Sequence, residues 1–235
     1  MKIGIVLTQW KRNHLIHQLN SIYNQTLKPH YIVVFQNEEH VDITPLKKKY
    51  NFIHVKSDYN TKYFGRFSYL FTLPIDICIV MDDDIIPGKN CLKNYVEQCI
   101  RKDAIIGGNG RIGYCSPHRD KVKQPREVGI RKETEKVDFV GHMWVFKKKC
   151  LYNMFGTEPF TYDTSEDMHL CYSNKVYGNI NSYAAKQLCS DDMCDVAYCT
   201  LADDEYSSFK TTKVELREAV EKYWMKKGLK HIVEN

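Results

Sequence analysis

The chain has 235 residues, of which 43% are hydrophobic and 27% are charged. This balance is typical of a folded globular protein and excludes a disordered or collagen-like chain. The 34 basic and 29 acidic residues give a net charge of +5, and they form no dense basic stripe of the kind that nucleic-acid binders carry. We therefore expect one compact domain over residues 1–235 and no nucleic-acid partner.

Three absences bear on localisation. The opening MKIGIVLTQW has a short apolar run before polar residues begin, which favours a buried strand over a signal peptide. No segment approaches the roughly 18 apolar residues of a membrane helix. Nine cysteines lack the spacing of a disulfide framework, which indicates reduced thiols. These features predict a cytoplasmic protein without a transmembrane segment.

The first part of the chain alternates apolar runs with helical spacing. Strands are predicted over residues 3–9, 31–37, 52–56 and 76–82, and apolar residues at helical spacing follow the first and the fourth. Continuous β-branched runs are typical of parallel strands buried on both faces. Residues 1–110 are therefore predicted to form an α/β unit, whose ligand would lie at the carboxyl ends of the strands.

The rest of the chain is less regular. Residues 111–135 are polar and lack a sustained period, so they are predicted to be a long loop. A strand broken at Gly141 is predicted in the apolar run that follows, then a short helix over 166–177 capped by Thr164 or Ser165. A terminal amphipathic helix is predicted over 212–228. Together these segments predict a mostly parallel central sheet flanked by helices.

Three consecutive carboxylates, here called the aspartate cluster (Asp82, Asp83 and Asp84), directly follow the fourth predicted strand. Adjacent like charges repel one another unless a cation or hydrogen-bond donors compensate them. Mn²⁺ and Mg²⁺ prefer oxygen ligands from carboxylates and bound phosphates. A solvated acidic turn is the ordinary alternative, but the position at the end of an apolar strand favours a metal site.

A series of sequence blocks resembles the GT-A glycosyltransferases, in particular their family-two-like members. The blocks occur in family order over about residues 3–185, and they are VLTQWKR, LNSIYNQTLKPHYIVVFQN, NTKYFGRF, MDDDIIPG, VGHMWVF and TSEDMHL. The resemblance implies a single Rossmann-like GT-A domain that transfers a sugar from a nucleotide-diphosphate sugar to an acceptor hydroxyl. It also implies a UDP-sugar donor, a Mn²⁺ or Mg²⁺ cofactor and a glycan or other hydroxyl acceptor. Its inverting members are the most similar, which favours inversion at the sugar; a retaining reaction on the same fold is the alternative.

The resemblance assigns the donor site residue by residue. Asp82 would contact the ribose or the metal. The resemblance does not decide between Asp83 and Asp84 as the direct metal ligand. Thr8 and Asn37 would line the base pocket. Arg66, in the block NTKYFGRF, would pair with the diphosphate, because the planar fork of donors on a guanidinium suits phosphate oxygens. An ordinary surface arginine is the alternative at that position.

On the acceptor side, the resemblance points to Glu166 and Asp167, here called the carboxylate pair. Asp167 would act as general base and Glu166 would orient the acceptor or the sugar. Capping of the predicted helix by negative charge is the alternative role for both. Residues that could form the sugar or acceptor floor follow the expected strand break, and these are Gly141, His142 and Trp144; strand packing is the alternative for them.

The resemblance also divides the chain. Residues 1–110 would be the nucleotide-binding half, 111–200 the acceptor-binding half and 201–235 a tail with the terminal helix. The loop over 111–135 is expected to influence acceptor choice.

Two other classes remain open. A sugar-nucleotide nucleotidyltransferase would share the α/β architecture, but VLTQWKRNH lacks a glycine-rich loop. A non-catalytic nucleotide or sugar-binding module would not need the carboxylate pair.

Overall fold

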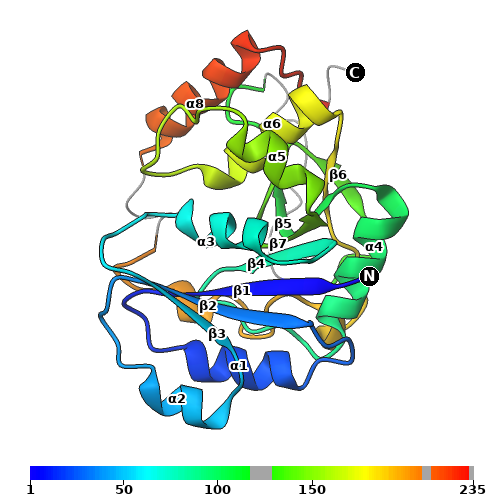
Figure 1. Cartoon of the computed structure of the whole chain (residues 1–235). Helices are drawn as coiled ribbons and strands as arrows, with labels where there is room; N and C mark the ends of the chain where they lie inside the picture. The colour runs from blue at the N-terminus through cyan, green and yellow to red at the C-terminus, as the bar shows by residue number, and fades with distance from the viewer. Residues whose placement is uncertain (117–128, 208–212, 233–235) are drawn as a thin grey trace.

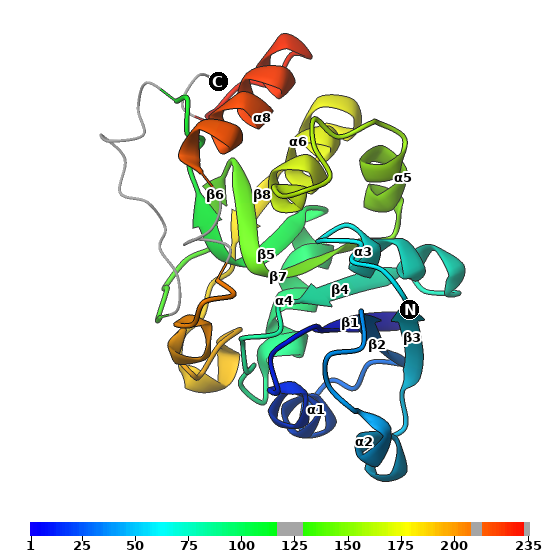
Figure 2. The same ribbon diagram turned by 90° about the vertical axis from the view of Figure 1, so that its left-hand side faces the viewer.

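The computed structural model describes residues 1–116, 129–207 and 213–232. Eight strands form one sheet in the order β3-β2-β1-β4-β7-β5-β8-β6, with helices on both faces (Figures 1 and 2). Four neighbouring strand pairs are parallel, and β7 and β6 run antiparallel to their neighbours. The predicted fold class, a mostly parallel α/β sheet flanked by helices, is confirmed.

The elements of the first half follow the predicted alternation. The strands are β1 (Ile3–Gln9), β2 (Tyr31–Asn37), β3 (Ile53–Ser57) and β4 (Ile77–Met81), and the helices are α1 (Leu15–Tyr23), α2 (Thr44–Lys49), α3 (Gly65–Ser68) and α4 (Cys91–Lys102). A 3-10 turn, Tyr69–Thr72, extends α3. All four predicted strands are present to within a residue of their predicted ends. The three central ones, β1, β2 and β4, are built around buried apolar runs, whereas β3 is the least buried.

The second half supplies the other strands and helices. They are β5 (Ile105–Arg111), β6 (Glu135–Val137), β7 (Phe139–Lys147), α5 (Lys149–Phe155), α6 (Glu166–Gly178), β8 (Ser182–Ala184) and α8 (Val214–Lys226), with 3-10 turns at Ser190–Asp192 and Thr200–Ala202. The predicted helices over 166–177 and 212–228 correspond to α6 and α8. The strands β6 and β8 were not predicted, because three residues are too short to show a period.

The two faces of the sheet carry separate hydrophobic cores. One core packs Leu15, Leu19 and Ile22 of α1 with Tyr95 of α4 against inward residues of β1 and β4. The other packs the opposite face against α3, α5, α6 and α8, with Trp224 of α8 fully buried. In Figures 1 and 2, α1 and α2 lie on one side of the sheet and α5, α6 and α8 on the other. A sheet covered in this way leaves its strand ends as the place for a ligand.

The predicted break at Gly141 is wrong: β7 continues through this residue and carries a bulge just after it. Gly107 pairs with Trp144 and Asn109 pairs with Gly141, so β7 has one more residue than β5 across this interval. His142 takes the extra turn with a φ of 67°. Bulges re-aim side chains beside functional sites, and this one places His142 at the end of β4, where its carbonyl accepts the amide hydrogen of Asp82 at 2.9 Å.

The predicted loop over 111–135 is only partly described. Its central residues, 117–128, lie outside the described ranges, so the expected role in acceptor choice stays a prediction. Near its end Arg131 is buried; its amide donates to the carbonyl of Gln187 at 2.7 Å and its guanidinium donates to that of Ala185 at 2.5 Å. This part of the segment is therefore packed against the chain that follows β8.

None of the helices in the described ranges combines the length and apolarity that crossing a bilayer requires. All nine cysteines lie in those ranges and are free thiols.

Candidate active site

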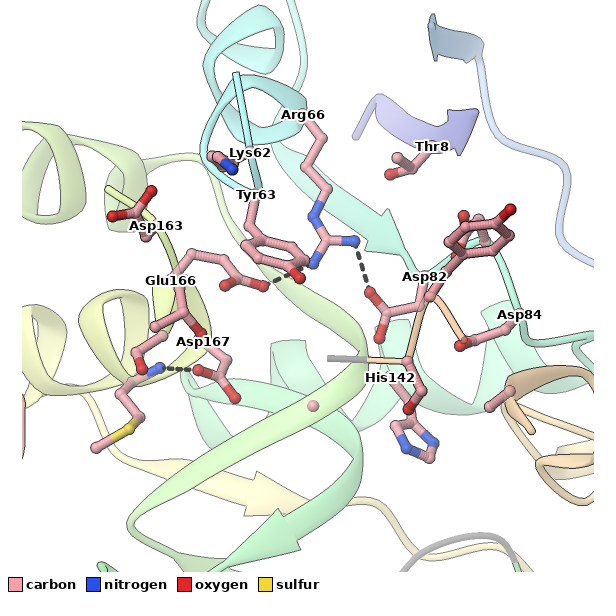
Figure 3. A pocket seen from close by; sticks show the side chains of 18 of the residues that line it. Thr8, Lys62, Tyr63, Arg66, Asp82, Asp84, His142, Asp163, Glu166 and Asp167 are labelled. Atoms are coloured by element: carbon pink, nitrogen blue, oxygen red, sulfur yellow. Dashed lines mark hydrogen bonds and ion pairs between the residues drawn. The ribbon is translucent and has the colours of Figure 1, made fainter. Parts of the chain in front are cut away.

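One cavity of about 860 Å³ opens at the carboxyl ends of β1, β2 and β4, beside the β7 bulge and the start of α6. It brings together every residue that the sequence predicted for the site, and these are Thr8, Asn37, Arg66, Asp82, Asp83, Asp84, Gly141, His142, Trp144, Glu166 and Asp167. Figure 3 draws 18 of its residues and labels ten, with Asp82 and Asp84 on the opposite side from Glu166 and Asp167. The pocket thus joins two acidic groups that lie far apart in the sequence.

Arg66 connects the two acidic groups. Its guanidinium donates to Asp82 Oδ1 at 2.5 Å and to Glu166 Oε1 at 2.7 Å (Figure 3). Arg66 is only 4% exposed, and the face of its guanidinium lies over the Trp144 ring, 4.8 Å from the centroid. A buried arginine needs such partners because an unpaired charge is costly to desolvate. The alternative of an ordinary surface arginine is wrong.

The carboxylate pair begins α6. Ser165 is the N-cap, as one of the two predicted positions, but it has a φ of 62° and makes no side-chain cap bond. Burial, opposed by Arg66, raises the pKa of Glu166 to about 7. Burial also raises the pKa of Asp167, whose Oδ1 accepts the amide hydrogen of Met168 at 2.7 Å. The helix dipole favours negative charge at this end, so both carboxylates combine a buried setting with a stabilising field.

The aspartate cluster is paired with a second arginine, Arg12. Arg12 Nη1 donates to Asp83 Oδ1 at 2.6 Å and to Asp84 Oδ2 at 2.8 Å. The same guanidinium makes a forked pair with Asp204, at 2.6 and 2.7 Å. Burial and the two neighbouring aspartates raise the pKa of Asp84 to about 7. Burial and mutual repulsion therefore disfavour the ionised form of all three carboxylates at once, and the positive charge of Arg12 offsets part of this repulsion.

The donor set of the cluster fits a hard divalent cation. In the described part of the chain no group of three or more His, Cys, Asp or Glu side chains is arranged to hold a metal ion. Asp82 and Asp84 each keep one carboxylate oxygen that none of the described side chains or amides contacts. Mg²⁺ and Mn²⁺ need only one or two carboxylates when a bound phosphate supplies the rest. Asp82 and Asp84 can therefore hold a cation together with a ligand phosphate.

Asn37 ends β2 and lines the pocket, as predicted, but its amide is used within the protein. Its Oδ1 accepts hydrogen bonds from the Thr61 amide and hydroxyl, both at 2.9 Å. Its Nδ2 donates to Asn60 Oδ1 at 2.9 Å and to the Lys62 carbonyl at 3.3 Å. Asn37 thereby fastens the segment that leads to Tyr63 and Arg66. Its predicted contact with a base stays a prediction.

The pocket floor comes from β5 and β7. His142 Nε2 lies 3.2 Å from Asn109 Nδ2, and Gly141 also lines the cavity. Trp144 is 2% exposed; its Nε1 donates to the Val140 carbonyl at 2.7 Å, and its ring packs edge-on against Phe67. The described contacts of Trp144 are thus with the core and with Arg66, which agrees with strand packing, the alternative role for this residue. His142, by contrast, faces the cavity (Figure 3).

The sequence matches no family model, and it matches no curated protein. Solved structures do resemble it. "Crystal structure of S. aureus TarS" aligns with a TM-score of 0.56 and 16% identity over 80% of this chain and 37% of that one. A fragment of the same protein, TarS 1-349, in complex with UDP gives a TM-score of 0.55 and 16% identity over 80% of this chain and 61% of the fragment.

The chain has the GT-A glycosyltransferase fold. It spans about a third of the TarS chain and about three fifths of the fragment. At 16% identity the likeness concerns the fold, and the same fold serves many substrates.

Several residues of this GT-A pocket were not predicted. They are Trp10, Arg12, Lys62, Tyr63 and Arg217. Trp10 and Arg12 follow β1, so the rule that ligands bind at the carboxyl ends of strands could have found them. Tyr63 lies three residues before Arg66 in the block that supplied that arginine. Arg217 lies in α8, and no local signal links it to the pocket.

Proposed function

We propose that the protein is a glycosyltransferase that moves a sugar from a UDP-sugar to an acceptor hydroxyl. One observation carries this proposal: Arg66 joins the aspartate cluster and the carboxylate pair within one pocket, through Asp82 and Glu166. Sugar transfer needs charge stabilisation on a leaving diphosphate and a base for the attacking hydroxyl. The two acidic groups supply one function each. The TarS fragment solved in complex with UDP, which shares the fold, supports the choice of donor.

The donor would bind at the aspartate end. Thr8 and Trp10 line the cavity at the end of β1 and would contact the base. Asp82 and Asp84 would hold Mn²⁺ or Mg²⁺, and Asp83 would contact the nucleotide. When bound, the cation would neutralise charge that develops on the leaving diphosphate. Arg66 stabilises the same charge from the other side of Asp82, in a site where burial strengthens electrostatic interactions.

The acceptor would bind against the carboxylate pair. Only the amide of Met168 contacts the carboxylate of Asp167 among the described hydrogen bonds, so its second oxygen can accept a proton. Asp167 would take the proton of the acceptor hydroxyl as that oxygen attacks the anomeric carbon, with inversion. Glu166 is held by Arg66 and would orient the sugar or the acceptor. Gly141, His142 and Trp144 lie along the floor between the two ends.

Thermal unfolding with a panel of nucleotides tests this proposal. We expect UDP or one UDP-sugar with Mn²⁺ to raise the melting temperature, because a ligand that binds only the folded state stabilises it by mass action. Asp84→Ala should abolish the Mn²⁺-dependent part. Glu97→Ala, at an exposed acid on α4, is the matched control.

The outcomes separate the rival functions. Slow UDP release from a UDP-sugar, accelerated by an acceptor, would support the transferase. Release of pyrophosphate from a nucleoside triphosphate and a sugar phosphate would indicate a nucleotidyltransferase. Nucleotide binding without release of either product would indicate a binding module, and no shift with any nucleotide would overturn the proposal.

A further inference from the structure

Asn37 uses its whole hydrogen-bonding capacity on one short segment, residues 60–62, here called the clamp loop. A carboxamide oxygen accepts two hydrogen bonds and its nitrogen donates two. All four are made: Thr61 supplies two donors, and Asn60 and Lys62 supply one acceptor each. The backbone amide of Thr61 can only donate and the Lys62 carbonyl can only accept, which fixes the orientation of the side chain. Asn37 is 4% exposed.

The clamp loop is also packed tightly against the end of β2. A Cβ added at Gly65 would lie 2.2 Å from Thr61 Oγ1 and 2.7 Å from Phe35 Cζ, so the chain after the loop has no room for a side chain there. Lys62 has a φ of 53°, and its amide donates to Asn60 Oδ1 at 2.8 Å. A left-handed conformation at a non-glycine residue persists only where its surroundings hold it. Asn37 provides that hold through the Lys62 carbonyl.

The loop places two hydrogen-bond donors along one wall of the pocket. Lys62, Tyr63 and Arg66 come from the same segment and lie on the same side of the cavity in Figure 3. Lys62 Nζ makes no ion pair with the described carboxylates. Burial raises the pKa of the Tyr63 phenol, so the hydroxyl stays protonated and can donate. An ammonium group and a hydroxyl beside Arg66 suit the oxygens of a phosphate group.

We propose that Asn37 is a positioning residue, which fixes the clamp loop so that Lys62 and Tyr63 contact the donor diphosphate, and that it does not read the base. This inference rests on the proposed nucleotide site. A contact between Asn37 and a base would require one of four satisfied bonds to break, which leaves a buried polar group without its partner. Asn37 ends β2, so base recognition is left to residues that line the cavity at the end of the neighbouring strand, β1.

Binding of UDP, CDP, GDP and the nucleoside uridine to Asn37→Asp and Asn37→Ala tests the proposal. Aspartate keeps the two acceptor contacts with Thr61 but loses both donors. We expect both variants to weaken all three diphosphates by a similar factor, roughly tenfold, with little change for uridine. If Asn37 reads the base, the loss will fall on one base alone and will appear equally with uridine. That result would overturn the proposal.

Asn60→Ala keeps β2 intact and provides a second variant. We expect it to reproduce the uniform loss, and the double variant with Asn37→Ala should lose less than the product of the two single losses, because both act on one loop. Independent, multiplying losses would contradict the proposal.

Hydrogen exchange at the Thr61 amide tests, without any ligand, whether Asn37 holds the clamp loop. We expect faster exchange in Asn37→Ala than in wild type. Unchanged exchange would overturn the clamp, whereas failure of wild type to bind any nucleotide would overturn the proposed function and the diphosphate contact with it.

Discussion

The two acidic ends of the pocket are built from the same residue types but in different surroundings. Each carboxylate of the aspartate cluster is paired with an arginine side chain: Asp82 with Arg66, and Asp83 and Asp84 with Arg12. In the carboxylate pair, Glu166 shares Arg66, but the described hydrogen bond to the Asp167 carboxylate comes from a backbone amide. A carboxylate held by cations is suited to carry charge, and one held by an amide is suited to take a proton.

The largest effect should come from Asp167 in the carboxylate pair. We expect Asp167→Asn to lower sugar transfer by about 10²- to 10⁴-fold, because a general base contributes that much, while UDP binding stays within about twofold. Acceptor-dependent UDP release and thermal shift with UDP measure the two quantities. Glu158→Gln, at an exposed acid between α5 and α6 that does not line the cavity, is the matched control and should retain activity. Full activity in Asp167→Asn would remove the distinction between the ends.

Arg66 tests the link between the ends. Arg66→Met keeps the length of the side chain but leaves Asp82 and Glu166 without their shared cation, which should cost about 3–5 kcal/mol of unfolding free energy. Urea unfolding measures this loss. Arg101→Met, at an exposed position on α4, should change stability by less than about 0.5 kcal/mol. Equal stability of the two variants would mean that the bridge does not hold the pocket together.

Arg12 tests the balance at the aspartate end. Removing its charge leaves Asp83 and Asp84 more negative, so Arg12→Ala should bind Mn²⁺ more tightly in the absence of nucleotide, by roughly tenfold. Titration calorimetry with Mn²⁺ alone measures this change. Lys11→Ala removes a neighbouring cation that lies over the Trp10 ring and serves as the control. Weaker Mn²⁺ binding in Arg12→Ala would show that Arg12 organises the cluster for the metal and does not compete with it.

The smallest effect is a pH dependence of stability from Glu166. Burial raises its pKa to about 7 in the folded protein, above the value of about 4.3 in an unfolded chain. The folded state therefore binds more protons between these values, and stability falls as the pH rises through 7. We expect Glu166→Gln to reduce this fall by a few degrees of melting temperature between pH 5 and pH 8. The pKa of Asp84 is raised in the same way, so part of the fall in stability should remain in Glu166→Gln. The same dependence of melting temperature on pH in the variant and in wild type would contradict the assignment to Glu166.

The degree to which the sequence predicted each element follows from burial. The strands β1, β2 and β4 were placed to within a residue because each contains a continuous run of buried apolar residues. In α8, by contrast, the sequence predicted an amphipathic helix, whereas the buried residues are Val220, Glu221 and Trp224, one of which is charged. Glu221 turns inward because His231 lies 3.2 Å from it, a contact that periodicity cannot show.

The sequence by itself determined the parallel half of the sheet and the position of the aspartate cluster at a strand end. These features depend on local patterns and on the order of strands, which a linear reading contains. Only the tertiary structure decided which charges meet: Arg66 and Glu166 are 100 residues apart and Arg12 and Asp204 are 192 apart. Ion pairs and amide contacts depend on distances of a few ångströms, and the folded chain sets these distances without leaving a period in the sequence.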